Sequence, residues 1–145
     1  MIALLQRVTE ARVDVKQKCV GRIGKGLLIL IGVEKDDTQA SADRLVERFL
    51  GYRVFADDQD KMNLSVMNIE GGVLLVPQFT LAADTSSGMR PGFSSAASPE
   101  KGKQLFEYLV EKTRQTYDQV ETGQFGANMQ VSLINDGPVT FRLSV

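Results

Sequence analysis

The sequence predicts an α+β fold in which an antiparallel or mixed β-sheet curls toward a barrel-like core and two helices pack on its outside. Extended apolar segments run through most of the chain, and only residues 38–50 and 98–117 carry apolar side chains at helical spacing. Two helices cannot cover both faces of so many strands. The sheet is therefore expected to bury part of its apolar surface by curling on itself.

Four strand candidates in the first 33 residues suggest a meander. They are residues 1–8, 11–16, 19–24 and 26–33. The last of them, GLLILIGV, is apolar throughout, as expected for a strand buried on both faces.

Both helices are predicted from their caps as well as their spacing. Thr38 supplies N-cap chemistry for the helix at residues 38–50. Ser98 and Pro99 form a strong start for the second helix, which should end near Tyr117. Between the helices we expect a short strand at residues 52–56, a solvated polar turn at 57–61 rather than a calcium loop, and a strand at 61–66 that rejoins the sheet.

Residues 71–81, GGVLLVPQFTL, form the most informative stretch. Four consecutive aliphatic residues indicate a buried strand, and Pro77 then removes a backbone donor, so regular pairing should loosen there. Gln78, Phe79 and Thr80 follow, and a rigid strand that ends in polar groups can hold reactive geometry. The alternative is a buried strand with a polar end. The long loop of small residues at 82–98 is typical of functional or mobile segments.

The C-terminal part of the chain predicts a turn and two more strands. The turn is at residues 123–126, and the strands are at 129–134 and 139–145. Asn135-Asp136-Gly137-Pro138 lies between the two strands and has ordinary hairpin-turn chemistry.

Composition limits the chemistry. The chain has 145 residues, which suits a single domain, and it contains no histidine, which excludes Ser-His-Asp and Cys-His catalysis within the chain. The single cysteine, Cys19, excludes an internal disulfide and a multi-cysteine zinc site. We expect no metal and no cofactor. Without a long apolar run or a signal-peptide core, we expect no membrane association and a cytoplasmic protein.

Charge is distributed unevenly. The net charge of −1 argues against a general nucleic-acid binder, but residues 1–26 carry six bases against two acids. This basic N-terminal face can meet phosphates at one limited site. The alternative is a solvated hairpin.

Two motifs make the sequence resemble a known family. PQFTLAADTSSGMRPGF at residues 77–93 and NDGPVTF at 135–141 closely resemble the D-aminoacyl-tRNA deacylases, formerly called D-tyrosyl-tRNA deacylases. MIALLQRV at the start and IGVEKDD at residues 31–37 are similar to that family too, so the similarity covers residues 1–145 as one deacylase domain.

The resemblance implies a closed or nearly closed β-barrel and a homodimer with an active site at each end of the interface. It implies hydrolysis of the ester that joins a D-amino acid to the 3′ end of tRNA. Gly137 and Pro138 match a cis peptide that reaches into the partner subunit's pocket and rejects L-amino acids, and Gln78, Phe79 and Thr80 match the segment at the scissile ester. Serine is common in the family where Pro77 stands here.

Chemical reasoning adds roles for these residues. The backbone N–H groups of Phe79 and Thr80 are the candidates for stabilising the oxyanion. One possibility is that the Thr80 hydroxyl is the nucleophile. The other, which we favour because no histidine can activate that hydroxyl, is that the 2′-hydroxyl of the tRNA organises or activates the attacking water. Exclusion of L side chains by Gly137 and Pro138 predicts that achiral glycyl-tRNA is also hydrolysed.

Roles can also be assigned to four further residues. Arg7 is expected to brace the Gly-Pro turn of the partner subunit, and Phe125 and Met129 to line a pocket for the terminal adenosine. Packing is the alternative for all three, and Arg90 either contacts phosphate or pins its loop. The alternative function from a different class is a non-catalytic nucleic-acid-binding small barrel, although the chain has no tryptophan. A purely structural dimer would leave both motifs unexplained.

Overall fold

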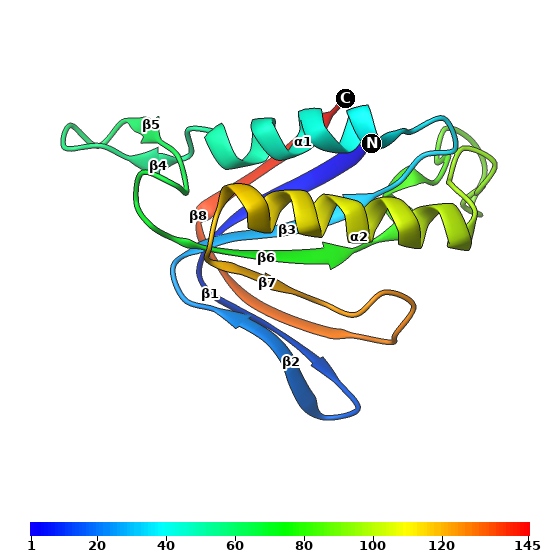
Figure 1. Ribbon diagram of the computed structural model, residues 1–145, viewed down its shortest axis with the longest axis horizontal. Helices are drawn as coiled ribbons and strands as arrows, with labels where there is room; N and C mark the ends of the chain where they lie inside the picture. Colours follow the sequence, from blue (N-terminus) through cyan, green and yellow to red (C-terminus); the bar gives the residue numbers. More distant parts are fainter.

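A six-stranded mixed sheet and two helices build the protein in the computed structural model, which describes residues 1–145 (Figure 1). The strands of the sheet are β1 (Ile2–Val15), β2 (Lys18–Ile23), β3 (Gly26–Gly32), β6 (Gly72–Pro77), β7 (Val120–Thr122) and β8 (Gln130–Ser144). Their order is β2-β1-β3-β6-β7, and β8 pairs with β1. The pairs β3–β6 and β6–β7 are parallel, whereas the other pairs are antiparallel. The mixed sheet is confirmed.

The first two strand candidates are one strand, so the prediction of four strands before residue 34 was wrong. β8 runs beside β1 along nearly its whole length and holds residues 2–15 in one extended segment. The first half of β1 pairs with β3 and the second half with β2. When the buried face changes within a strand, the sequence pattern is the same as that of two separate strands. The partner strand that would distinguish them is not known from the sequence.

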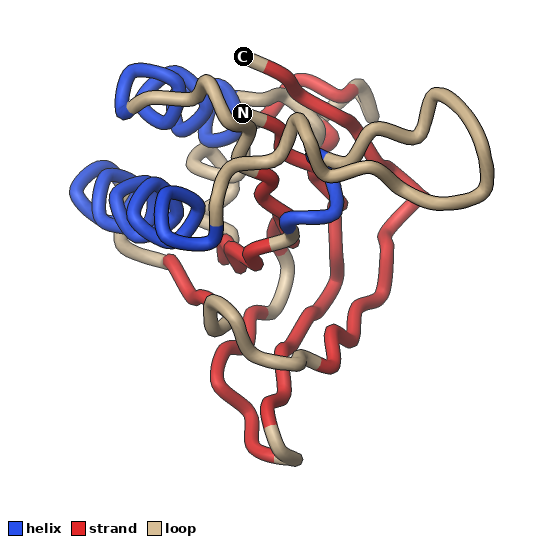
Figure 2. The backbone as a smooth tube through the Cα atoms, turned by 90° about the vertical axis from the view of Figure 1, so that its right-hand side faces the viewer, coloured by secondary structure: helices blue, strands red, loops and turns tan.

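The sheet is curled until its two ends almost meet, and in Figure 2 the strands surround a common interior. β2 lies against β7 without a ladder between them. A Cβ atom on Gly21 would lie 2.6 Å from the carbonyl oxygen of Thr122, so only glycine permits this approach. The interior is filled by Val8, Ala11, Val13, Ile23, Leu28, Leu74 and Val76. The barrel-like core is therefore confirmed.

The two helices, α1 (Gln39–Gly51) and α2 (Pro99–Thr116), lie side by side on one outer face of the sheet (Figure 1). Both helix predictions are confirmed, with Thr38 and Ser98 at the N-caps. The inward stripe of α1 consists of the residues that the spacing predicts: Ala42, Leu45, Val46, Phe49 and Leu50. They join the main core of 24 buried residues between helices and sheet. No helix is both long and apolar enough to span a membrane.

The segment between α1 and β6 differs from the prediction. β4 (Phe55–Ala56) and β5 (Met62–Leu64) pair with each other in a separate small sheet instead of rejoining the main one. The polar turn between them is confirmed. The Asp57 carboxylate accepts the N–H groups of Lys61 at 3.0 Å and Gln59 at 2.9 Å, and these bonds lower the pKa of Asp57. β7 was not predicted, because three residues are too short for a pattern.

β8 corrects the prediction of two strands joined by a hairpin turn. Residues on both sides of Gly137 and Pro138 pair with the same strand, so the chain does not reverse there. Between the pairs Gln6–Thr140 and Val8–Asn135, β1 contains only Arg7 whereas β8 contains residues 136–139. The extra residues form a bulge that projects from the ladder.

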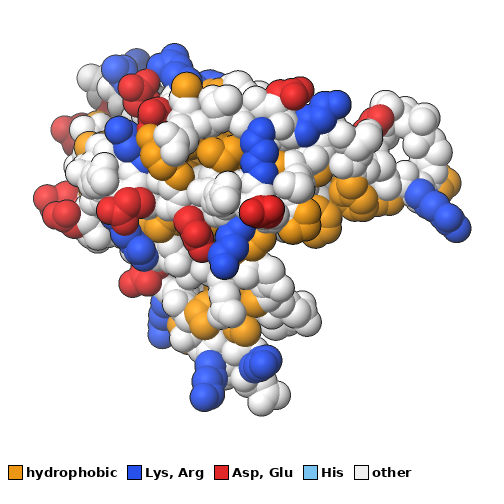
Figure 3. Space-filling model, turned by 45° about the vertical axis from the view of Figure 1, so that its right-hand side comes forward, with side chains coloured by type: hydrophobic (Ala, Val, Ile, Leu, Met, Phe, Trp, Pro, Cys, Tyr) orange, Lys and Arg blue, Asp and Glu red, His pale blue; other side chains and the backbone are white.

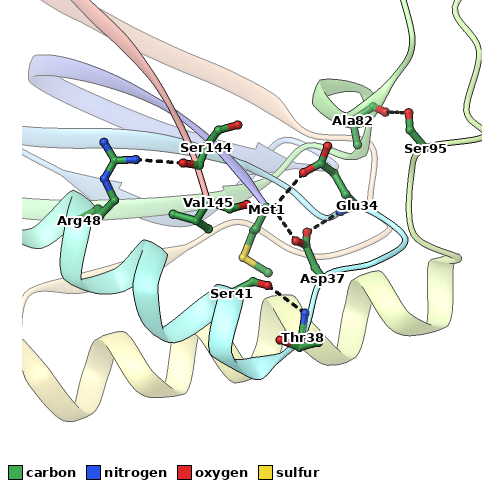
Figure 4. Close-up of polar contacts among 10 residues, drawn as sticks. All are labelled: Met1, Glu34, Asp37, Thr38, Ser41, Arg48, Ala82, Ser95, Ser144 and Val145. Carbon is green, nitrogen blue, oxygen red and sulfur yellow. Dashed lines mark hydrogen bonds and ion pairs between the residues drawn. The ribbon is translucent and has the colours of Figure 1, made fainter.

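Charged groups hold both ends of the chain near the start of α1 (Figure 4). The α-ammonium of Met1 lies 2.5 Å from the Asp37 carboxylate and 2.9 Å from that of Glu34, and it donates to the Val145 carbonyl at 3.1 Å. Asp37 also accepts the N–H of Glu34 at 2.7 Å. Both Met1 and Asp37 are buried, so each depends on the other for its compensating charge.

Candidate functional site

An apolar cavity of about 460 Å³ opens where β3 and β6 end and α2 begins. Ten of its 16 lining residues are hydrophobic, so it suits a ligand with a large apolar or aromatic part. Gln78, Phe79, Phe125 and Met129 are among the lining residues. The structure thus brings together four residues that the sequence selected from three separate segments.

The polar segment after β6 is a short 3₁₀ helix, η1 (Phe79–Ala82), and not the strand end that the sequence predicted. The N–H of Gln78 donates to the Ile31 carbonyl at 2.8 Å and fixes the point where the helix leaves the sheet. The first bond within η1 runs from the Leu81 N–H to the Gln78 carbonyl at 3.2 Å. The N–H groups of Phe79 and Thr80 precede it, so neither takes part in the helix's own bonding.

The side chain of Thr80 has a single hydrogen-bond partner in the chain. The Gln78 side-chain amide donates to the Thr80 hydroxyl oxygen. No lysine or carboxylate contacts that hydroxyl. In the following loop, Asp84 is hydrogen-bonded to the Ser86 side chain and to its N–H, which lowers the pKa of Asp84 and makes it a poor base. The surroundings therefore give the Thr80 hydroxyl no activating base.

Two aromatic pairs lie at the cavity, and three of their four rings, those of Phe79, Phe106 and Phe125, line it. Phe125 packs against Phe106 of α2 with ring centroids 6.2 Å apart, over the flat surface that Gly102 leaves on the helix. Phe79 packs against Phe93 of the long loop at 5.3 Å, and both rings are substantially exposed. Exposed rings beside an apolar cavity can stack on a planar ligand.

Met129 is held in place by the backbone around it. Its sulfur accepts the N–H of Gln124 at 3.3 Å, and a Cβ atom on Gly123 would lie 2.8 Å from the same sulfur. The Pro77 ring also lines the cavity and lies 3.6 Å from that Cβ position. Pro77 thus contributes an apolar surface where a serine would present a hydroxyl.

Arg7, Gly137 and Pro138 form a second group. The Gly137–Pro138 peptide bond is cis, as the resemblance implied. Arg7 donates to the Asp136 carbonyl at 2.9 Å and to the Val54 carbonyl at 2.7 Å, and lies 3.6 Å from the Asp136 carboxylate. Arg7 therefore braces the bulge of its own chain, whereas the sequence-based assignment placed it against the partner's turn.

The two groups lie at different levels of the sheet, four residues apart along β3. Along β3, Leu27 is opposite Arg7 and Ile31 is opposite Pro77. Four residues of a strand span about 13 Å. Gly137 and Pro138 do not line the cavity of their own chain. A single chain consequently does not bring all of the predicted site residues together.

Several lining residues were missed by the sequence analysis: Ala97, Ser98, Pro99, Gly102, Phe106, Gly126 and Ala127. Ser98 and Pro99 were recognised only as a helix start. Gly102 offered a usable signal, because glycine in a helix interior costs about 1 kcal/mol relative to alanine and suggests a close neighbour. No group of three or more His, Cys, Asp or Glu side chains is arranged to hold a metal ion.

Solved structures share this curled sheet with its two helices. One described as c-Myc DNA Unwinding Element Binding Protein has a TM-score of 0.96 and 38% identity, covering 100% of this chain and 99% of the other. One described as a probable eukaryotic D-amino acid tRNA deacylase has a TM-score of 0.82 at 19% identity, covering 98% of both chains, which is a likeness of fold alone. The fold therefore places the chain in the class of small barrel-like proteins to which these structures belong.

Sequence comparison identifies the family within that class. A sequence model described as D-Tyr-tRNA(Tyr) deacylase matches residues 4–144, and the chain belongs to that family. Relatives named D-aminoacyl-tRNA deacylase are 59% identical in Photorhabdus laumondii and 57% identical in Haemophilus influenzae. Both alignments cover 145 residues and the full length of each chain.

Proposed function

We propose that residues 1–145 act as one domain that hydrolyses the ester of D-aminoacyl-tRNA to free tRNA and amino acid. The observation that carries the proposal is the apolar cavity lined by Gln78 and Phe79, in a chain that is 59% identical to a named deacylase over its full length. Phe125 and Met129 bind the terminal adenosine, and Gln78 orients the aminoacyl ester. The reaction requires no metal and no cofactor.

Hydrolysis of an ester passes through a tetrahedral oxyanion. The N–H groups of Phe79 and Thr80 stabilise that charge, because η1 leaves them free at a position fixed by the Gln78–Ile31 bond. Losing one such donor typically costs about 10²–10³ in rate. The 2′-hydroxyl of the terminal ribose assists the attacking water, since the Thr80 hydroxyl has only an amide donor beside it.

The complete site requires a homodimer, with Gly137 and Pro138 of one subunit closing the cavity of the other. The separation of about 13 Å between the two groups along β3 supports this arrangement. Ile134 and Phe141, which flank the bulge on β8, are 54% and 37% exposed and supply apolar surface for such an interface. The Gly137–Pro138 segment then excludes L side chains, and glycyl-tRNA is hydrolysed because glycine has no side chain to exclude.

The test compares matched D- and L-tyrosyl-tRNA by following loss of the ester bond. Hydrolysis of the D form with the L form spared is the expected result. Equal hydrolysis of both would retain the esterase and remove the chiral filter. Glycyl-tRNA that stays intact at enzyme concentrations clearing the D form would contradict exclusion as the mechanism. We place the reaction in the cytoplasm, where aminoacyl-tRNA is used.

A nucleic-acid-binding protein without catalysis is the second candidate. The name of the 38% identical relative, c-Myc DNA Unwinding Element Binding Protein, describes binding to DNA. Inertness toward both tyrosyl-tRNAs, combined with strongly salt-dependent binding of nucleic acid, would favour this function.

A further inference from the structure

The β1–β2 hairpin extends beyond the body of the protein, as Figure 1 shows at the bottom of the view. Its turn is made by Lys16 and Gln17, which have φ values of 49° and 67°. Residues 16–20 are all exposed. The hairpin tip therefore contributes little to the hydrophobic cores, and its side chains are free to contact a partner.

The tip carries positive charge that no acidic side chain neutralises. Arg12 donates to the Asp14 carboxylate at 2.8 Å, so these two charges compensate each other. Lys16 and Lys18 take part in none of the chain's ion pairs. In Figure 3 the lower projection ends in blue Lys and Arg side chains. Against a net charge of −1, this local field is what an anionic partner would meet.

The part of the hairpin next to its turn pairs with the segment that follows the cavity-lining Met129. Met129 lines the cavity, and the next residue, Gln130, pairs with Asp14 across the β1–β8 ladder. Lys16 lies two residues beyond Asp14, about 7 Å further along the strand. A ligand whose end occupies the cavity therefore passes close to the hairpin tip.

A second basic arm lies on the loop after η1. Asp84 and Gly92 close this loop through two backbone hydrogen bonds of 2.7 and 2.9 Å, and it projects to the right in Figure 2. Arg90 lies near its tip, is exposed, and makes no ion pair. The base of the loop is fixed to the cavity wall, because Phe93 packs on Phe79.

We propose that Lys16 and Lys18 on the hairpin and Arg90 on the loop bind backbone phosphates of the tRNA acceptor stem while its 3′ end occupies the cavity. The inference rests on the proposed function and extends it from the ester to the stem. Each bound phosphate releases counterions, so these contacts raise affinity without reading sequence. The competing explanation is that Lys18 on the edge strand β2 and Lys16 in the turn before it only prevent strand-to-strand aggregation.

The test compares the variant Lys16→Gln/Lys18→Gln, the variant Arg90→Gln and a control with two equally exposed charges removed elsewhere. The control is Lys61→Gln/Arg114→Gln, on the β4–β5 turn and the far end of α2, where both side chains are exposed and belong to none of the chain's ion pairs. Dissociation constants of uncharged tRNA are measured from about 50 to 200 mM salt, and hydrolysis is measured with D-tyrosyl-tRNA and with D-tyrosyl-adenosine, which has no stem.

Removal of the two lysines should reduce the slope of log Kd against log salt by about two, and removal of Arg90 by about one. A slope lower by two means that the fourfold rise in salt weakens the variant about 16-fold less than the wild type. KM for D-tyrosyl-tRNA should rise while hydrolysis of D-tyrosyl-adenosine stays at the wild-type rate.

Slopes equal to that of the control would overturn the proposal. It would also be overturned if the variants lost as much activity on D-tyrosyl-adenosine as on D-tyrosyl-tRNA, because these residues would then act at the cavity. A protective role against aggregation would change the solubility and leave the slope unaltered. If the wild type hydrolyses neither substrate, the proposed function fails, and the slopes with uncharged tRNA still decide whether the arms bind RNA.

Discussion

Replacing Arg7 by methionine tests whether this side chain holds the Gly137–Pro138 bulge. The change keeps an unbranched apolar stem and removes two charge-assisted hydrogen bonds, to the carbonyls of Asp136 and Val54. Each such bond is worth about 1.5–3 kcal/mol, and the ion pair with the 45% exposed Asp136 side chain adds at most about 1 kcal/mol. Taking the lower value for each of the two bonds, we expect a loss of about 3 kcal/mol.

That loss corresponds to a fall in Tm of about 6–12 °C for a domain of this size. Urea unfolding at a fixed protomer concentration measures the stability, and the ratio of D- to L-tyrosyl-tRNA hydrolysis measures the filter. Arg7→Lys should lose about half as much, since one ammonium serves one carbonyl well. The control is Arg44→Met, whose guanidinium is 65% exposed and pairs only with Glu47. A loss below about 1 kcal/mol in Arg7→Met, with the D/L ratio unchanged, would refute the bracing role.

Three further predictions concern the site and the core. Thr80→Ala should lower kcat by less than about 10²-fold, and complete loss in a folded protein that still binds tRNA would restore the nucleophile hypothesis. Gly123→Ala should raise KM, because its Cβ would lie 2.8 Å from the sulfur of Met129 in the cavity. The control Gly24→Ala, whose Cβ would meet nothing within 4 Å, should leave KM unchanged, and equal KM values in the two variants would contradict the prediction. Asp37→Asn should lower the free energy of unfolding in urea by about 3–5 kcal/mol, because it leaves the buried α-ammonium of Met1 with too little compensating charge. The control Asp36→Asn changes an exposed side chain and should lower it by less than about 0.5 kcal/mol. Similar losses in both variants would reject the buried pair as a stabilising contact.

Most of the local structure could be predicted from the sequence alone. Both helices follow from caps and a period of 3.6, because these signals lie within a few residues of each other. The apolar runs in β3 and β6 follow from the need to bury both faces of a strand. The absence of histidine limited the catalytic chemistry before any geometry was known. The motifs and the family resemblance also selected four residues that line the cavity: Gln78, Phe79, Phe125 and Met129.

The way in which distant segments meet could not be predicted from the sequence. Because β1 and β8 pair with each other, the predicted strands at residues 1–8 and 11–16 form the single strand β1, and those at 129–134 and 139–145 form the single strand β8. The predicted hairpin turn within β8 is a bulge for the same reason, since a strand is defined by a partner that lies far away in the chain. The same pairing set Arg7 against its own Asp136. The β1–β3 and β3–β6 pairings set Pro77 at the cavity four residues of β3, about 13 Å along the strand, from the level of Arg7. Local sequence encodes backbone preference and burial, whereas register and the direction of pairing come from long-range packing that no short window of sequence contains.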